Sequence, residues 1–288
     1  MNNFTIFSSF FQGKALLFLE RVIDLALEED GQDLTSNAVF SQESDAKAVI
    51  LAKESCIVAG LPISELILAR LPGNTETNFL VPEGFRVESG QRIMSIAGQT
   101  IKILKAERII LNLISRLSGI ATLTDIYCQK LKGTGVRLLD TRKTSPGLRY
   151  PEKYAVLVGG GENHRLNLEN MLMLKDNHID QCGSITNAVS ILRKTYSPCL
   201  DIEVECRTLE DVEEAVMAEV QRIMLDNMSM EQLKKSLSRI PPDIESEISG
   251  CITLDNIEKI ASLKPDFVSS GALTHSAKHI DMSMKIEV

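Results

Sequence analysis

The stretch from Asp201 to Asn227, DIEVECRTLEDVEEAVMAEVQRIMLDN, decides the fold class. Its two ends, DIEVEC at 201–206 and RIMLDN at 222–227, are short apolar runs that finish in polar residues. Between them, residues 209–218 carry apolar side chains at the spacing of a helix. A strand, a crossover helix and a second strand form the unit from which parallel sheets are built.

The same alternation extends in both directions along the chain. Further strand-like runs are VRLLD (136–140), MLMLKD (171–176), ESEISGC (245–251) and FVSSGA (267–272), and further helical patterns cover 186–194, 230–237 and 254–263. About six such units can close into a barrel or remain an open, doubly wound sheet, and the alternation alone does not choose between them. No G-x-G-x-x-G opens the first helix, which disfavours a dinucleotide-binding fold.

The N-terminal half has a different rhythm. Residues 14–29 have the apolar spacing of an amphipathic helix. From 46 to 103, short β-like runs are broken by Gly and Pro, which indicates a mostly antiparallel sheet. Residues 104–131 then form a long helical pattern, which we expect to be interrupted around Ser118 and Gly119.

Composition narrows the class of protein. The chain has 288 residues, 44% of them hydrophobic, which is enough for a sizeable core. A net charge of −8 and the absence of Trp argue against a nucleic-acid binder. Its six cysteines include no C-x-x-C pair, which favours reduced thiols over disulfides or zinc. Residues 1–11 lack a basic n-region, and no run approaches about 18 apolar residues, so we expect a soluble cytoplasmic protein.

Polar residues follow the predicted strands at the edge where parallel sheets place active sites. They are Asp140, Thr141, Arg142, Lys143, Lys175, Asp176, Glu203, Glu205, Asp226 and Asn227. Taken singly, each has a plain explanation. An Asp after a strand is often a helix cap, Lys175 could be a surface residue or the Schiff-base lysine of a barrel aldolase, and His164 could be a structural histidine. Their coincidence at successive strand ends favours an active site.

The charge distribution indicates the class of substrate. Residues 137–175 hold seven Lys or Arg against four Asp or Glu, within a chain of net charge −8. Such a basic cluster suits a small polyanion. Glu205 and Asp226 offer hard oxygen ligands for Mg²⁺ or partners for sugar hydroxyls. Ser249-Gly250 and Gly271-Ala272 follow short runs where bare N–H groups can hold a phosphate. Together these features predict an enzyme that acts on a phosphorylated sugar.

At these residues the chain resembles the quinolinate phosphoribosyltransferases, also called carboxylating nicotinate-nucleotide pyrophosphorylases. The matching stretches are Glu107-Arg108 with Asn112, 118–122 (SGIAT), 140–149 (DTRKTSPGLR), 153–155 (KYA), 159–165 (GGGENHR), 174–178 (LKDNH), 225–227 (LDN) and 271–276 (GALTHS), with 33–35 and 59–61 earlier in the chain. The resemblance runs from about residue 15 to the end and implies the transfer of phosphoribosyl from phosphoribosyl pyrophosphate to quinolinate, with decarboxylation to nicotinate mononucleotide.

The resemblance also implies an architecture: an N-terminal α/β sandwich over 1–117 and an incomplete, TIM-like α/β barrel over 118–288, whose C-terminal tail can pack back on the first domain. It implies a homodimer, or a hexamer built from dimers, in which Arg108 completes the partner's site. The substrate-binding positions carried over are Arg142, His164, Arg165 and Lys175 for the quinolinate carboxylates with Thr141 beside them, Lys143 for phosphoribosyl pyrophosphate, Glu205 and Asp226 for ribose and Mg²⁺, and Ser249, Gly250, Gly271 and Ala272 for the 5′-phosphate. We expect Lys143, Lys175, Glu205 and Asp226 to be the catalytic group.

One position departs from the family pattern. Cys251 stands where the family commonly has a second Gly after Ser-Gly. If that position has a positive φ, its Cβ costs on the order of 1 kcal/mol. Two other functions stay open: a related enzyme associated with molybdate transport, which would differ in its carboxylate clamp, and a catalytically inactive homologue that serves as a binding protein.

Overall fold

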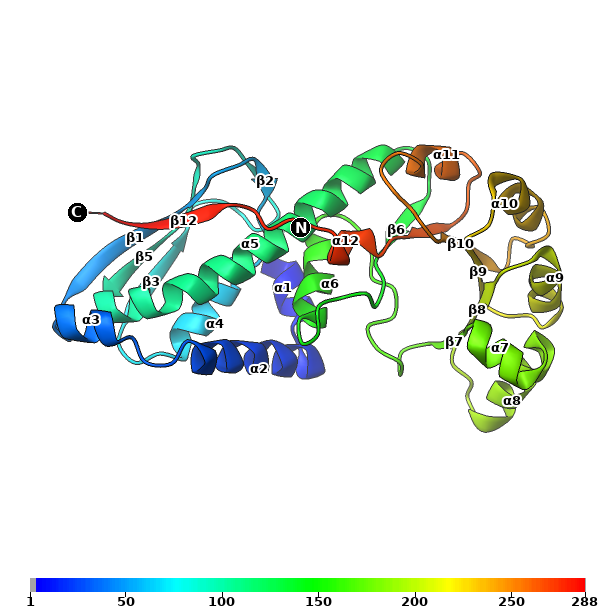
Figure 1. The fold of residues 1–288 in the computed structure, drawn as a ribbon, viewed down its shortest axis with the longest axis horizontal. Coiled ribbons are helices and arrows are strands. Elements are labelled where there is room, and N and C mark those ends of the chain that lie inside the picture. The colour runs from blue at the N-terminus through cyan, green and yellow to red at the C-terminus, as the bar shows by residue number, and fades with distance from the viewer. Residues whose placement is uncertain (1–3, 288) are drawn as a thin grey trace. The chain divides into compact units, whose positions relative to one another are not determined.

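The computed structural model describes residues Phe4–Glu287 (Figure 1). They divide into two compact units. The first comprises the residues up to Asp125, Thr144–Gly160 and the tail from Leu273, and the second comprises Ile126–Lys143 and Gly161–Ala272. The single division predicted after residue 117 stays a prediction, and the compact units assign 118–125, 144–160 and 273–288 to the N-terminal part of the chain.

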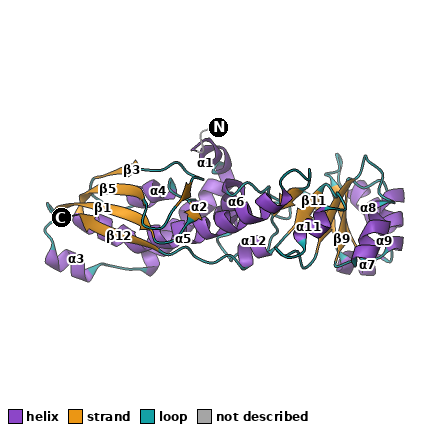
Figure 2. Ribbon diagram, turned by 90° about the horizontal axis from the view of Figure 1, so that it is seen from above, coloured by secondary structure: helices purple, strands orange, loops and turns teal. Residues whose placement is uncertain are grey.

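The first unit contains a four-stranded antiparallel sheet, in the order β12-β1-β5-β3 (Figure 2). Its strands are β1 (Asp45–Ala52), β3 (Thr75–Phe79), β5 (Arg92–Gln99) and β12 (Met282–Glu287), and β2 (Cys56–Ile57) pairs separately with β4 (Arg86–Val87). The antiparallel sheet predicted over 46–103 is confirmed. The pattern did not reveal β3, whose residues TETNF are mostly polar, or the pairing of β12 with β1.

Helices accompany this sheet in the first unit. They are α1 (Phe4–Phe10), α2 (Gly13–Glu29), α3 (Leu34–Val39), α4 (Ile63–Ala69) and α6 (Arg149–Val158). The predicted helix at 14–29 is confirmed as α2, which buries Leu19 and Ile23 completely. Burial of this apolar face stabilises the helix more than its intrinsic propensity does.

Helix α5 (Thr100–Leu131) runs without a break through Ser118 and Gly119, so the predicted interruption is wrong. Gly119 is required by packing, because a Cβ there would lie 1.8 Å from the carbonyl oxygen of Lys278. By length and composition alone, α5 is apolar enough to cross a membrane, and 61% of its most apolar window is buried within the protein. That burial is typical of the core helix of a soluble protein. The pattern at 104–131 predicts a helix but no apolar run of membrane length, because polar residues interrupt the run.

The second unit contains six parallel strands in the order β6-β11-β10-β9-β8-β7. They are β6 (Arg137–Leu139), β7 (Leu172–Leu174), β8 (Ile202–Cys206), β9 (Arg222–Asp226), β10 (Glu245–Ser249) and β11 (Phe267–Ser269). Each lies within one of the six predicted runs. Because β6 and β7 are the two edges of the sheet, it is an incomplete barrel. The strand-helix alternation alone had left open whether the sheet closes into a barrel or stays an open, doubly wound sheet.

Helices connect these parallel strands. They are α7 (Asp176–Cys182), α8 (Ile185–Thr195), α9 (Leu209–Met217), α10 (Met230–Leu237) and α11 (Ile257–Ala261), and α12 (Ala272–His275) follows the last strand. Helices α8, α9 and α10 lie along one face of the sheet (Figure 1). The predicted crossover helices are confirmed, with α11 shorter than the predicted 254–263.

Candidate active site

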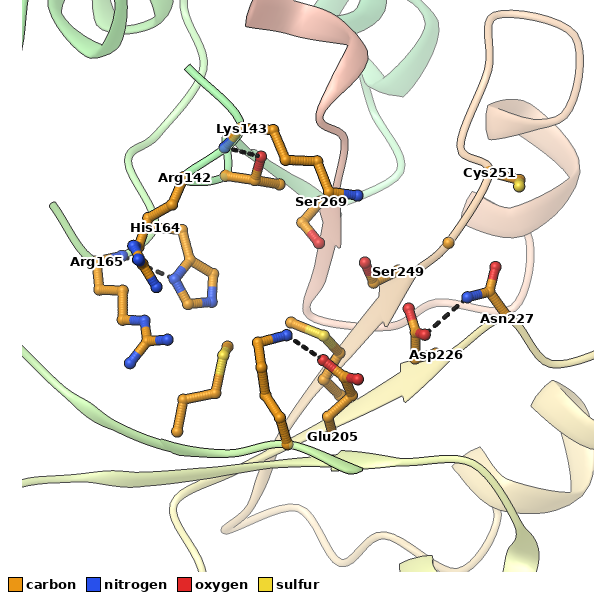
Figure 3. A pocket seen from close by; sticks show the side chains of 15 residues that line it. Arg142, Lys143, His164, Arg165, Glu205, Asp226, Asn227, Ser249, Cys251 and Ser269 are labelled. Carbon is orange, nitrogen blue, oxygen red and sulfur yellow. Dashed lines mark hydrogen bonds and ion pairs between the residues drawn. The ribbon is translucent and has the colours of Figure 1, made fainter. Parts of the chain in front are cut away.

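A cavity of about 500 Å³ opens at the carboxyl ends of the six parallel strands (Figure 3). Its lining residues are Thr141, Arg142, Lys143, His164, Arg165, Met173, Lys175, Glu205, Met224, Asp226, Asn227, Ser249, Gly250, Cys251 and Ser269. Ten of the thirteen predicted site residues lie there, although they come from segments more than 100 residues apart. The edge of the sheet brings them together, as the strand-end pattern predicts.

Arg142 and Arg165 form the basic side of this cavity (Figure 3). Burial, together with the charge of Arg142, lowers the pKa of the Arg165 guanidinium. Arg165 Nη1 donates to the Met171 carbonyl oxygen at 3.2 Å, while the buried Nε of Arg142 has no hydrogen-bond acceptor among the described residues. Two neighbouring guanidiniums with unused donors suit an anion with two carboxylates.

Glu205 and Asp226 form the acidic side. Glu205, near the end of β8, pairs with the Lys175 ammonium. Asp226, the last residue of the neighbouring strand β9, accepts a hydrogen bond from Asn227 Nδ2 at 2.7 Å. Two carboxylates on adjacent strands fit a Mg²⁺ ion that keeps several waters and shares the oxygens of a phosphate substrate. This donor set therefore suits the expected metal.

A tight turn after β10 borders the same cavity. Gly250 has a φ of +90°, and a Cβ there would lie 2.7 Å from the main-chain nitrogen of Asn227. Cys251 follows with a φ of +48°, so this position does have the left-handed backbone for which the family commonly uses Gly. Gly250 thus permits a close approach of two main-chain segments, and Cys251 accepts a strained conformation beside it.

Three predicted residues lie elsewhere. Arg108 is exposed on α5 and lines a separate cavity of about 360 Å³ in the first unit, next to Pro146 and Gly147. Gly271 and Ala272 follow β11 and are absent from the lining residues of the main cavity. The Ala272 N–H donates to Ser270 Oγ at 3.3 Å. The main cavity is thus built without these three residues in the chain described.

Sequence reasoning missed three lining residues: Met173, Met224 and Ser269. Strand register explains their positions, because Met173 pairs with Glu203 and Met224 with Glu205 across adjacent strands. Paired residues on neighbouring strands point to the same face of a sheet. Only the pairing register between neighbouring strands would have identified these residues, and the register cannot be derived from the sequence of one strand.

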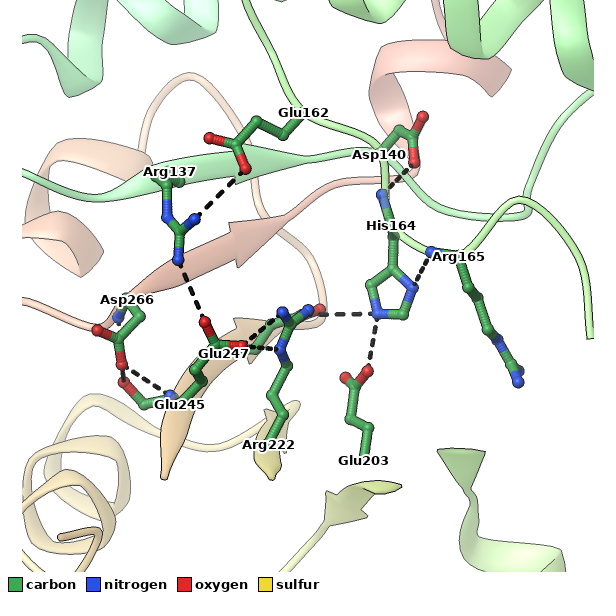
Figure 4. A network of polar contacts seen from close by, with 11 residues as sticks. Arg137, Asp140, Glu162, His164, Arg165, Glu203, Arg222, Glu245, Glu247 and Asp266 are labelled. Carbon is green, nitrogen blue, oxygen red and sulfur yellow. Dashed lines mark hydrogen bonds and ion pairs between the residues drawn. The ribbon is translucent and has the colours of Figure 1, made fainter. Parts of the chain in front are cut away.

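A second layer of charged residues lies against the cavity wall, inside the sheet (Figure 4). Glu203 and Glu247 are completely buried, and His164 is 7% exposed. Burial raises the pKa of both carboxyls to about 7. The predicted sharing of one face by Glu203 and Glu205 thus places one carboxylate in this buried layer and the other in the cavity.

Two family models match the chain, one over its N-terminal part and one over the rest. Residues 33–118 match the family model described as "Quinolinate phosphoribosyl transferase, N-terminal domain", and residues 120–285 match the corresponding C-terminal domain. The chain belongs to the quinolinate phosphoribosyltransferase family. This confirms the family indicated by the sequence motifs, together with the fold class: an N-terminal antiparallel α/β part and a TIM-like parallel part.

Members of the quinolinate phosphoribosyltransferase family resemble the chain over nearly its whole length. It is 40% identical over 290 residues to the carboxylating, chloroplastic nicotinate-nucleotide pyrophosphorylase of Arabidopsis thaliana, covering 93% of this chain and 83% of that one. It is 44% identical over 262 residues to a probable carboxylating nicotinate-nucleotide pyrophosphorylase of Synechocystis, covering 90% and 89%. The crystal structure of NadC from Streptococcus pyogenes matches with a TM-score of 0.89 at 39% identity, covering 93% and 96%.

Proposed function

We propose that the chain transfers the phosphoribosyl group of phosphoribosyl pyrophosphate to quinolinate, with Mg²⁺, giving nicotinate mononucleotide, carbon dioxide and pyrophosphate for the biosynthesis of NAD. The observation that supports this most strongly is one cavity that holds both the Arg142–Arg165 pair and the Glu205–Asp226 pair. The names of the relatives support the same reaction. We also propose that it works as a soluble protein in the cytoplasm, although the Arabidopsis relative is named as chloroplastic.

Quinolinate fits the basic side of the cavity. Its two carboxylates can accept hydrogen bonds from Arg142 and Arg165, and charge-assisted bonds of this kind fix orientation as well as affinity. Thr141 and His164 line the wall beside these arginines, and the Lys175 ammonium lies next to Glu205 on the acidic side. This arrangement directs the pyridine nitrogen toward the ribose.

Phosphoribosyl pyrophosphate fits the acidic side. The ribose hydroxyls can donate to Glu205 and Asp226, while Lys143 can pair with the pyrophosphate. Ser249 and Gly250 offer a hydroxyl and bare main chain to the 5′-phosphate. Glu205 and Asp226 would hold Mg²⁺, which would neutralise phosphate charge. Gly271 and Ala272 are a further candidate segment for the 5′-phosphate, in the turn after β11.

The chemistry follows from these positions. The pyridine nitrogen forms a bond to ribose C1 as the bond from C1 to pyrophosphate breaks. The negative charges of Glu205 and Asp226 favour the positive charge that develops on the ribose. The pyridinium then accepts the electron pair of the bond to the 2-carboxylate, carbon dioxide leaves, and C2 takes up a proton. No covalent enzyme intermediate is needed. Lys175 forms an ion pair with Glu205, whereas a barrel aldolase uses its lysine as a free amine nucleophile.

We further propose that the active assembly is a homodimer, or a hexamer of dimers, in which Arg108 enters the site of the partner subunit. The exposure of the Arg108 side chain on α5, which leaves its guanidinium open to a partner subunit, supports this role. A guanidinium donated across the interface would add a third cation to the quinolinate side.

An assay with two acceptors tests the proposed reaction. Purified protein is incubated with phosphoribosyl pyrophosphate, Mg²⁺ and either quinolinate or nicotinic acid, and nicotinate mononucleotide is measured. We expect product from quinolinate alone, and loss of turnover when Mg²⁺ is chelated. If quinolinate neither binds nor reacts, the relative associated with molybdate transport replaces this proposal. If it binds without turnover, an inactive binding protein does.

A further inference from the structure

Three buried side chains meet just beneath the wall of the substrate cavity (Figure 4). Glu203 comes from β8, Glu247 from β10, and His164 from the segment between β6 and β7. His164 Nε2 lies 3.0 Å from Glu203 Oε2 and 3.6 Å from Glu247 Oε2. Neither glutamate lines the cavity, so neither can touch a substrate there. Burying two carboxylates costs free energy of folding, so we expect them either to have a function or to be paired with a cation.

The proton of the His164 ring can be assigned from its other nitrogen. Nδ1 accepts a hydrogen bond of 2.7 Å from the main-chain N–H of Arg165. A nitrogen that accepts cannot carry a proton, so in the neutral ring the proton is on Nε2. Nε2 lies 3.0 Å from an oxygen of Glu203 and 3.6 Å from an oxygen of Glu247, and the negative charge of an ionised carboxylate at such a distance favours a proton on that nitrogen.

The tautomer argues against a metal ion held by these three residues. A histidine that binds a metal through Nε2 needs a bare Nε2 and usually donates from Nδ1. Here Nδ1 accepts instead. A cation already serves the carboxylates as well, because Arg222 Nη1 lies 3.5 Å from Glu247 Oε2. The Arg222 guanidinium is held over the ring of Phe267, 4.2 Å from its centroid.

The His164 ring therefore lies between the two glutamates, which are near its Nε2, and the main-chain N–H of Arg165, which donates to its Nδ1. On the main chain, the His164 N–H donates to Asp140 Oδ1 at 2.9 Å, which fixes the same segment to the end of β6. The backbone at His164 and Arg165 is thus fixed by two hydrogen-bond acceptors, Asp140 and the His164 ring. Its guanidinium enters the cavity from that position.

We propose that Glu203 and Glu247 are positioning residues: they hold His164 in the Nε2–H tautomer, and through the His164 ring they set where Arg165 meets the quinolinate carboxylate. This inference rests on the proposed function of the cavity. It assigns to two residues outside the substrate contacts a specific effect on quinolinate affinity. Residues that support the groups in direct contact with a substrate commonly have such effects, because small displacements weaken a bidentate clamp.

The tautomer can be measured directly in the free protein. The chain has four histidines, so the ring nitrogens of His164 can be assigned by comparing ¹⁵N-labelled wild type with a His164→Gln variant. We expect a protonated Nε2 and a bare Nδ1 in wild type. A protonated Nδ1 in wild type would overturn the proposal.

Kinetics test the effect on the substrate. In Glu203→Leu and Glu247→Leu, which remove the carboxylates at similar volume, we expect the KM for quinolinate to rise about 10-fold or more. The KM for phosphoribosyl pyrophosphate should stay within about 3-fold, because a lost ground-state contact to one substrate affects that substrate alone. Glu203→Gln keeps an oxygen acceptor for the Nε2–H and should restore most of the quinolinate affinity.

A matched control lies on the same strand as Glu247. Ser246 Oγ bonds to Asp266 Oδ2 at 2.7 Å. Ser246→Ala removes a buried contact from β10 without touching His164, so its KM for quinolinate should match wild type. Equal increases in both KM values, or an unchanged quinolinate KM in soluble, folded Glu203→Leu, would refute the positioning role. So would Mn²⁺ binding that is lost in Glu203→Leu and kept in Glu205→Gln. Absence of wild-type turnover would instead refute the proposed function.

Discussion

At some positions of the site, the space around the Cβ limits the residue type as much as the chemistry does. Gly250 and Cys251 both have a positive φ, but only Gly250 lies so close to Asn227 that a Cβ has no room. The sequence motif indicated a phosphate turn at this place and identified Cys251 as its unusual member. It could not show that the crowding comes from Asn227, since that contact joins two strands.

Gly250→Ala should therefore impair the site more than backbone strain alone would. The new Cβ would lie 2.3 Å from Asn227 Oδ1, so the turn must move and the KM for phosphoribosyl pyrophosphate should rise at least about 10-fold. Gly133→Ala is the control, because Gly133 has a φ of +80° in open space. It should lose about 1 kcal/mol of stability and keep its KM. Equal kinetics in the two variants would contradict the steric account.

At the scale of elements, the sequence predicts what is periodic and local. All six parallel strands and four of the helices that connect them, α8 to α11, could be located because apolar runs and helical spacing repeat along the chain, whereas the short α7 was missed. The continuity of α5 could not be predicted, because Gly119 has a poor intrinsic helix propensity. Glycine is needed there because of a close contact with Lys278, which is distant in the sequence. The Glu247–Arg222 contact was missed for the same reason, as it depends on which strands are neighbours.

Gly119→Ala tests whether packing overrides propensity in α5. Alanine favours an isolated helix over glycine by about 1 kcal/mol, which alone would stabilise the protein. The added Cβ would lie 1.8 Å from the Lys278 carbonyl oxygen, so we expect a loss of about 1–3 kcal/mol instead. Denaturant unfolding measures the sign. Ile126→Ala, at a half-exposed position of the same helix, should cost less. A stabilised Gly119→Ala protein would contradict the close contact.

For the whole molecule, buried carboxyls set the pH dependence of stability. Burial raises the pKa of Glu83 to about 7, outweighing its hydrogen bonds from Tyr154 and from the main chain of Gly60 and Leu61. Because the folded pKa lies above the unfolded one, this contribution is fully present below about pH 4.5 and is lost as pH rises through 7.

We expect stability to fall by about 1 kcal/mol for this group between pH 6 and pH 8. Thermal unfolding of wild type and Glu83→Gln at both pH values measures it. The variant should show a smaller fall than wild type, and identical pH dependence in the two proteins would show that Glu83 does not titrate in this range.

The proposed entry of Arg108 into the partner's site can be tested with mixed dimers. Arg108→Ala and Lys175→Ala should each be inactive alone, with unchanged circular dichroism. If Arg108 acts in the partner's site, mixed dimers have one site with both residues intact, and the refolded mixture should recover roughly 25% of wild-type activity. Mixing Lys175→Ala with Glu205→Gln, two variants of the same cavity, provides the control without recovery. Recovery absent from both mixtures would assign Arg108 to its own chain.

The most direct test of the central claim follows the carboxylate that leaves. Quinolinate labelled with ¹³C in its 2-carboxylate is incubated with phosphoribosyl pyrophosphate and Mg²⁺, and labelled carbon dioxide and nicotinate mononucleotide are measured together. The account predicts equal amounts of the two products, in wild type and at a greatly reduced rate in Arg142→Ala. Nicotinate mononucleotide without labelled carbon dioxide, or full activity in Arg142→Ala, would contradict it.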